Sequence, residues 1–175
     1  MRASKTFPSD RFTDPRMSSL WLVVHSFFTG TNPGNRAGRP RIPVVALLVS
    51  EQDRDVLTRS FGEEAVDVRF AESYEDAYSL ASRLAAPLIL VDRDWPGTVW
   101  RTAVAALASL PHRACVLLVS GVADGYLWQE LIRTGGYDVL PKPFHRDKVA
   151  RAVKLALSYW NSAPKRAVSG EGRKS

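Results

Sequence analysis

The central part of the chain repeats one pattern five times: a short apolar run is followed by a segment with helical periodicity. The apolar runs are predicted as strands at Pro43–Ser50, Val66–Ala71, Pro87–Asp92, Ala114–Gly121 and Tyr137–Leu140. Parallel neighbours need a long connection between them, so the repeat predicts parallel strands joined by right-handed helical crossovers. We therefore expect an α/β fold with an open, doubly wound sheet of five parallel strands.

Each apolar run precedes a segment whose apolar residues recur at the spacing of one helix face. The clearest start signal is Ser73, a residue type that caps helices, before a helix that extends to Leu84. The first helix is predicted to end at Gly62. The remaining helices are predicted at Val99–Leu110, Gly125–Arg133 and Asp147–Trp160.

The two ends of the chain differ in composition from this middle part. Residues 1–42 hold seven Lys/Arg against two Asp and include a Gly-, Pro- and Arg-rich stretch, so we predict a largely disordered leader. Residues 161–175 have the same loop-like character and are predicted to form a basic, disordered tail. Residues 43–160, with 13 basic and 15 acidic residues, are predicted to form the single folded domain.

Charge and apolar content argue against several classes of function. The formal net charge is +6, but the excess lies in tails without interleaved aromatic residues, so we do not expect nucleic acid as a partner. The apolar run Leu20–Phe28 is too short to span a membrane and contains His25, so we expect no membrane association. Cys115 is the only cysteine, which excludes an intrachain disulfide and fits a reducing, cytoplasmic compartment.

Polar residues gather where the predicted strands end. They are Ser50 with Glu51, Asp92 with Asp94, Ser120, and Lys142. In a doubly wound sheet the ligand site lies outside the carboxyl ends of the strands, so these residues should lie around one pocket. Carboxylates suit a hard cation such as Mg²⁺, whereas a hydroxyl and an ammonium suit the oxygens of a phosphoryl group.

On these residues the segment 43–160 resembles the receiver domain of bacterial two-component response regulators. The resemblance rests on "LVDRDWPG", with Asp92 four residues before Pro96, on "LLVSG", which contains Ser120, and on "GGYDVLPKPF", which contains Lys142. It implies the flavodoxin-like (βα)5 form of the predicted sheet, with strand order 2-1-3-4-5.

The resemblance also implies a role for each residue. Asp92 would be the nucleophile and phosphoacceptor, and Ser120 and Lys142 would contact the phosphoryl oxygens. Glu51, Asp92 and the main-chain carbonyl of Asp94 would ligate Mg²⁺. The chain would be a stand-alone receiver in phosphorelay signal transduction, phosphorylated by a histidine kinase or phosphotransfer protein, with an output protein that the sequence does not identify. It would not be an enzyme beyond its own phosphoryl transfer and hydrolysis.

Two positions depart from the receiver pattern. A pair of acids usually follows the first strand, but here Ser50 stands first and the longer Glu51 second; Asp53 would compensate only if the helix begins late. Val139 stands where receivers commonly have a Tyr or Phe, and Tyr137 is on the same strand face by parity. These departures leave a second reading open: a pseudo-receiver, a binding module that does not depend on phosphorylation.

Three aromatic residues lie on the last two predicted helices. Tyr126, Trp128 and Trp160 are either core residues or anchors of an interface, and the last two helices are a candidate surface for a homodimer.

A flavodoxin-like protein that binds FMN is the third interpretation of the same sheet. The first turn, "SEQDRD", argues against it, because it lacks glycine and its acids would repel a phosphate.

Overall fold

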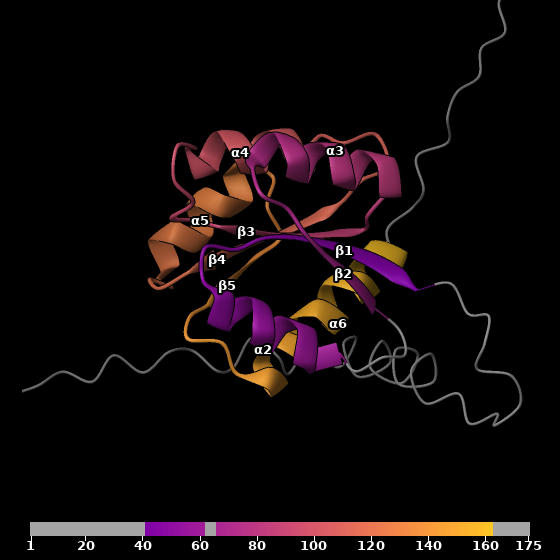
Figure 1. Cartoon of the computed structure of the whole chain (residues 1–175). Helices are drawn as coiled ribbons and strands as arrows, with labels where there is room; N and C mark the ends of the chain where they lie inside the picture. Colours follow the sequence, from indigo (N-terminus) through magenta and orange to yellow (C-terminus); the bar gives the residue numbers. More distant parts are fainter. Residues whose placement is uncertain (1–40, 62–65, 163–175) are drawn as a thin grey trace, which may run out of the picture. The chain divides into compact units, whose positions relative to one another are not determined.

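The computed structural model describes residues 41–61 and 66–162, in which five strands alternate with five helices (Figure 1). The strands are β1 (Ile42–Leu47), β2 (Val66–Phe70), β3 (Leu88–Asp92), β4 (Cys115–Ser120) and β5 (Asp138–Pro141). The helices are α2 (Glu51–Phe61), α3 (Tyr74–Leu84), α4 (Trp100–Ala108), α5 (Gly125–Arg133) and α6 (Arg146–Ser162). The predicted disordered leader and tail lie outside the described residues, except for residues 41, 42, 161 and 162 at their inner ends.

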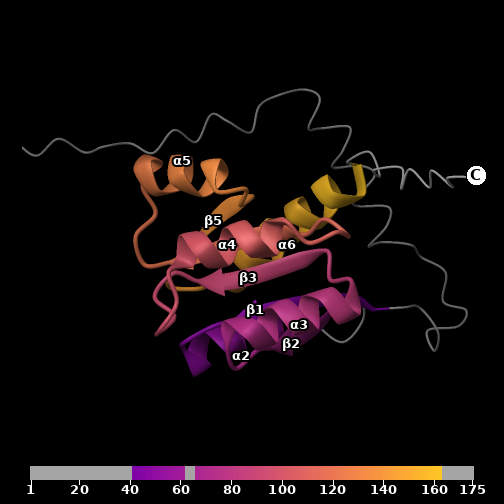
Figure 2. The ribbon, with the colours of Figure 1, turned by 90° about the horizontal axis from the view of Figure 1, so that it is seen from above.

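The five strands form one parallel sheet in the order β2-β1-β3-β4-β5. Figure 2 shows β2 and β5 at opposite sides of the sheet, with β1 and β3 between them. The predicted doubly wound, flavodoxin-like arrangement is confirmed. The strand order reverses between β1 and β3, which is where such sheets place their ligand sites.

Helices cover both faces of the sheet and enclose two apolar layers (Figure 1). Helices α3, α4 and α5 pack on one face, and α2 and α6 pack on the other. Strands β3 and β4 are buried at every position, as expected for central parallel strands that are covered on both sides. The outer strands β2 and β5 are only partly buried.

Short polar side chains fix where α3 and α5 begin. The hydroxyl of Ser73 accepts a hydrogen bond from the backbone N–H of Asp76 at 3.1 Å, which confirms the predicted cap of α3. Asp124 caps α5 in the same way, with Leu127 N–H as the donor. None of the helices in the described ranges is long and apolar enough to cross a membrane.

Cys115 lies at the start of β4 and is buried, as the apolar run around it predicts. Its thiol donates a hydrogen bond to the carbonyl of Ala156 in α6 at 3.5 Å. Burial raises the pKa of the Cys115 thiol to about 11, although the nearby charge of Arg113 lowers it. The folded protein therefore keeps this proton at a pH where the unfolded chain has lost it.

The buried thiol gives a pH-dependent prediction. Below pH 9 Cys115 is protonated in both states; between about pH 9 and 11 only the unfolded chain ionises, so stability falls as pH rises. Urea unfolding at pH 8 and pH 10 should show that wild type loses about 1 kcal/mol more than Cys115→Ala over this interval. Equal losses in the two proteins would contradict the assignment.

Candidate functional site

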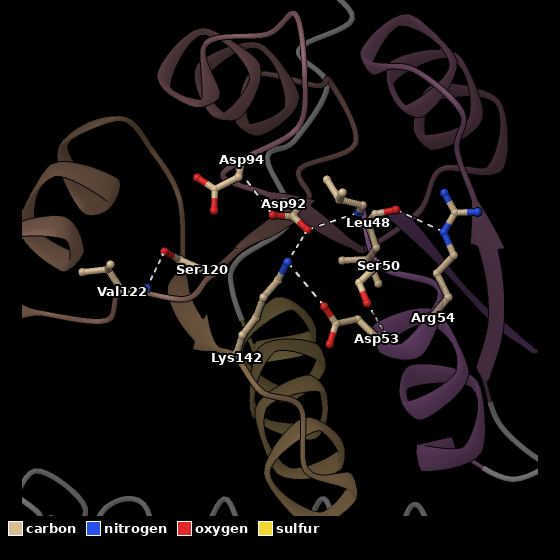
Figure 3. A network of polar contacts seen from close by, with 10 residues as sticks. Leu48, Ser50, Asp53, Arg54, Asp92, Asp94, Ser120, Val122 and Lys142 are labelled. Carbon is tan, nitrogen blue, oxygen red and sulfur yellow. Dashed lines mark hydrogen bonds and ion pairs between the residues drawn. The ribbon is translucent and has the colours of Figure 1, made fainter.

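Asp92 ends β3 at the carboxyl edge of the sheet, and its side chain is fully buried. The backbone N–H of Val49, after β1, donates to Asp92 Oδ2 at 3.2 Å. The backbone N–H of Asp94 donates to Oδ1 at 3.2 Å. Two neighbouring loops thus hold the carboxylate in one orientation at the point where the strand order reverses (Figure 3).

Lys142 directly follows β5 and reaches across the carboxyl edge to Asp92 (Figure 3). Its Nζ lies 2.6 Å from Asp92 Oδ2, which makes a charge-assisted hydrogen bond. The backbone N–H of Lys142 donates to the carbonyl of Ser120 at 2.9 Å. Asp92 and Lys142, which are 50 residues apart in the sequence, therefore lie together in the structure, as the sequence predicts.

The ammonium of Lys142 stays charged in this pocket. Partial burial lowers the pKa of Lys142, but the hydrogen bond and charge of Asp92, with the charge of Asp53, outweigh it. The net effect raises the pKa above its ordinary value, so the ion pair is intact at neutral pH. A charged hydrogen-bond donor beside a fixed carboxylate could stabilise the oxygens of a phosphoryl group bound there.

Ser120 ends β4 beside Asp92 and Lys142, and the whole residue is buried. Its hydroxyl accepts a hydrogen bond from the backbone N–H of Val122 at 3.1 Å and so faces its own loop (Figure 3). The structure therefore brings Ser120 to the expected edge, with its hydroxyl engaged by the β4–α5 loop.

Asp94 lies in the turn after β3, and the backbone N–H of Trp95 closes this turn on the Asp92 carbonyl at 3.3 Å. The Asp94 residue is exposed, and its carboxylate points away from Asp92 (Figure 3). Asp94 contributes its backbone N–H to the pocket, whereas the sequence suggested its backbone carbonyl as a metal ligand.

The structure does not bring Glu51 into the pocket. Its side chain is 85% exposed and forms an ion pair with Arg54 at 3.3 Å on the first turn of α2. The reason is local: the hydroxyl of Ser50 accepts from the backbone N–H of Asp53 at 3.3 Å, so α2 begins at Glu51. This start directs Glu51 outward, which corrects the position predicted for its carboxylate.

Asp53 is the acid that occupies the pocket instead. The residue is only 7% exposed, and together with Leu57, one helical turn later, it forms the buried face of α2. Its Oδ2 lies 3.3 Å from Lys142 Nζ (Figure 3). The sequence predicted that Asp53 could replace the missing acid only if the helix after β1 began late. This prediction was wrong, because Asp53 reaches the pocket from the first turn of a helix that begins at Glu51.

The pocket thus combines two carboxylates, Asp53 and Asp92, around one ammonium. Residues 41–61 and 66–162 contain no group of three or more His, Cys, Asp or Glu side chains that could hold a metal ion. Two carboxylates nevertheless fit Mg²⁺, which keeps several waters and is commonly bound through one or two carboxylates together with phosphate oxygens. The donor set suits this ion better than a metal that needs an all-protein cage.

Val139, which stands where receivers commonly have an aromatic residue, and Tyr137 pack on opposite sides of the sheet. Val139 is half-buried and packs against the α3–α4–α5 layer. Tyr137 packs against the opposite layer, and the centroid of its ring lies 5.0 Å from that of the Tyr159 ring. The inference that the two residues share a face was wrong, because β5 begins only at Asp138. Tyr137 instead follows a turn in which Gly135 has φ of +94°.

The three aromatic residues of the last helices have different environments. Tyr126 and Trp128 on α5 are exposed, and the indole N–H of Trp128 donates to Asp138 Oδ1 at 3.2 Å. Trp160 on α6 packs against the α2–α6 layer and donates to the carbonyl of Arg113 at 2.5 Å. The aromatic surface that the sequence suggested is therefore on α5, and Trp160 is part of the packing.

The fold that surrounds this pocket is similar to that of several solved structures. The structure resembles the chemotaxis protein CheY4 of Vibrio cholerae with a TM-score of 0.61 at 18% identity, over 67% of this chain and 99% of that one. It resembles the signal receiver domain of the putative Luxo repressor protein of Vibrio parahaemolyticus with a TM-score of 0.63 at 21% identity, over 70% and 94% of the two chains. This part of the chain has the receiver-domain fold.

A third solved structure places the same receiver fold inside a longer protein. NtrX from Brucella abortus, in complex with ADP, matches with a TM-score of 0.60 at 20% identity, over 70% of this chain but 27% of that one. No family model and no curated protein matches the sequence. The resemblance suggested by the sequence motifs is thus confirmed at the level of the fold.

Proposed function

We propose that this chain accepts a phosphoryl group on Asp92 and acts as a receiver in phosphorelay signal transduction. The observation that carries the proposal is the buried Asp92 carboxylate held against the Lys142 ammonium at 2.6 Å, at the carboxyl edge of a receiver-type sheet. A fold alone does not imply a function, so the pocket has to support the chemistry. Its fixed carboxylate and charged donor do so.

In the proposed reaction an oxygen of Asp92 attacks the phosphorus of a phosphohistidine or of a small acyl phosphate. A bond forms between this oxygen and phosphorus while the P–N or P–O bond to the donor breaks, and the donor leaves with the electron pair. The product is an aspartyl phosphate. The Val49 and Asp94 amides, which donate to the two carboxylate oxygens, keep the nucleophile oriented for this attack.

Lys142 and Ser120 would bind the phosphoryl oxygens. The Lys142 ammonium already lies at the Asp92 oxygen and needs only a small displacement to contact an added phosphoryl group. The Ser120 hydroxyl would have to exchange its bond with Val122 N–H for one to the phosphoryl group. Such an exchange would move the β4–α5 loop and couple phosphorylation to the surface.

We further propose that the pocket uses Mg²⁺. Asp92, Asp53 and the main-chain carbonyl of Asp94 would hold it, with Asp53 in the role that the sequence assigned to Glu51. When bound, the ion would supply positive charge at the phosphoryl oxygens.

The signal would pass by protein contact, with a histidine kinase or phosphotransfer protein as the source of phosphate. The names of the similar structures, a chemotaxis protein and a signal receiver domain, support a signalling role. We propose that the chain has this role in the cytoplasm. We propose the exposed aromatic surface of α5, Tyr126 and Trp128, for contact with an output protein or a second copy of the chain. We propose no enzymatic activity for the chain beyond its own phosphoryl transfer and hydrolysis.

Incubation of the purified chain with acetyl phosphate and Mg²⁺, followed by intact mass measurement, tests the proposal. We expect one added phosphate on the folded protein, and no adduct when urea unfolds the chain before incubation. A folded protein that gains no mass would favour the pseudo-receiver reading instead.

A further inference from the structure

The peptide that joins Leu48 to Val49 lies between two charged side chains. It follows Leu47, the last residue of β1 and the last that pairs with β3. On one side of this peptide the Val49 N–H donates to Asp92 Oδ2 at 3.2 Å. On the other side the Leu48 carbonyl accepts a hydrogen bond from Arg54 Nε at 3.1 Å (Figure 3). One peptide group therefore connects a guanidinium to the carboxylate of the pocket.

The two hydrogen bonds act on opposite ends of the same dipole. A trans peptide directs its C=O and its N–H to opposite sides, and the positive end of its dipole is at the N–H. A guanidinium at the carbonyl and a carboxylate at the N–H both stabilise this one orientation. Linked hydrogen bonds also polarise one another, so the charge of Arg54 strengthens the bond from Val49 to Asp92. Half a turn of the peptide would instead place the Leu48 carbonyl oxygen against the carboxylate.

The guanidinium of Arg54 is held beside this loop by its other contacts. Its Nη1 lies 3.3 Å from Glu51 Oε1, and its Cζ lies 5.4 Å from the centroid of the Phe70 ring in β2. The side chain is 23% exposed, so water screens its charge only in part. Arg54 follows Asp53 on α2, and the helix start that places Asp53 in the pocket therefore also places Arg54 at the loop after β1.

We propose that Arg54 is a positioning residue for the nucleophile: through the Leu48–Val49 peptide it keeps the Val49 N–H on Asp92 Oδ2. The inference rests on the proposed function of the pocket and adds to it a residue that acts one peptide away from the carboxylate. Without Arg54 the carboxylate would keep its bond from the Asp94 N–H but lose the fixed donor on the side of β1. It would then adopt orientations from which attack on phosphorus is unproductive.

The test follows amide hydrogen exchange in the full chain by NMR, without any phosphodonor. Arg54→Met keeps an unbranched side chain beside Phe70 and removes both the donor and the charge. The Val49 amide should exchange about tenfold faster in this variant, because the peptide that carries it is released. The Asp94 amide donates to the other carboxylate oxygen from a different loop, so its exchange should change by less than about twofold. A general loss of stability would accelerate both amides equally.

Arg54→Lys tests whether a charged donor restores the effect. The lysine ammonium is one bond further from Cα than Nε and can reach the same carbonyl, so Val49 exchange should return to within about threefold of wild type. Arg59→Met is the matched control, because Arg59 lies on the same helix and pairs with Asp55 on the exposed side. It should leave both amides unchanged. Equal effects of Arg54→Met and Arg59→Met, or equal acceleration of Val49 and Asp94, would overturn the proposal.

The kinetics of phosphate uptake from acetyl phosphate with Mg²⁺ give a second measurement. Arg54→Met should lower the maximal rate of adduct formation about tenfold and leave the half-saturating acetyl phosphate concentration within about twofold. The reason is that Arg54 orients the nucleophile and does not bind the phosphodonor. A change confined to the half-saturating concentration would contradict the positioning role.

The dispersion of the amide spectrum shows whether each variant is folded. If Arg54→Met unfolds, Arg54→Gln keeps an N–H donor at the length of Nε and removes the charge, and it should accelerate Val49 exchange about threefold. A chain whose Val49 amide responds to Arg54 but takes no phosphate would refute only the proposed function. A chain that takes phosphate while Val49 exchange is the same in wild type and Arg54→Met would refute only the positioning role.

Discussion

Asp92→Asn should abolish the phosphate adduct that we expect wild type to form with acetyl phosphate and Mg²⁺. The amide of asparagine keeps the shape of the side chain, but its oxygen is not an anionic nucleophile and its nitrogen cannot accept the bond from Lys142. The Val49 and Asp94 amides donate to different carboxylate oxygens, so the remaining oxygen keeps one of the two bonds, and circular dichroism checks that the variant is folded. Intact mass after timed incubation measures the effect, with an adduct fraction near zero expected.

The control is Asp55→Asn, which removes one negative charge from α2. Asp55 is exposed and forms an ion pair with Arg59 at 3.1 Å, outside the pocket. This variant should form the adduct to the same extent as wild type. An adduct that persists in Asp92→Asn, or that is lost equally in Asp55→Asn, would show that the acceptor is another residue or that net charge alone decides the reaction.

Leu118→Ala should cause a large loss of stability. Leu118 is fully buried in β4, the strand between β3 and β5, and belongs to the layer under α3, α4 and α5. Truncating a buried leucine removes apolar contacts and leaves a cavity, at a cost of about 2–5 kcal/mol. Thermal unfolding followed by circular dichroism should show a fall in Tm of roughly 10 °C.

Val122→Ala is the matched comparison for the core variant. Val122 follows β4 by two residues, and the residue is 52% exposed, so its truncation should change stability by less than about 0.5 kcal/mol. The backbone N–H that bonds to Ser120 is unaffected by the substitution. A loss in Leu118→Ala as small as that in Val122→Ala would mean that β4 is not buried on the face that α3, α4 and α5 cover.

The fold could be predicted from sequence because the physical signals agreed along the chain. The apolar runs at β3 and β4 predicted strands, which the structure buries at every position, and the Ser73 cap marked where α3 begins. Errors arose at element ends. Tyr137 was assigned to β5 by alternation, but the strand begins one residue later and the ring packs on the other side of the sheet.

The pocket was predictable only where its residues end a strand. Asp92, Ser120 and Lys142 lie at the carboxyl edge because parallel strands bring their ends together. Asp53 comes from a helix, and its direction depends on which residue begins that helix. The available signal was Ser50 three residues before an acid, a pattern that marks a helix start and could have identified Asp53 as a residue of the first turn.

The hydrogen bond between Ser50 and Asp53 fixes where α2 begins, so the number of residues between this cap and an acid decides whether its carboxylate faces the pocket. Successive side chains point about 100° apart around a helix axis. One residue inserted between Ser50 and Asp53 would leave the composition of the acidic turn intact and yet rotate Asp53 away from Lys142. In chains of this kind, the helix carboxylate that faces the aspartate at the end of β3 is identified by counting from the helix cap. Two sequences with the same acids at different positions from the cap would have differently charged pockets.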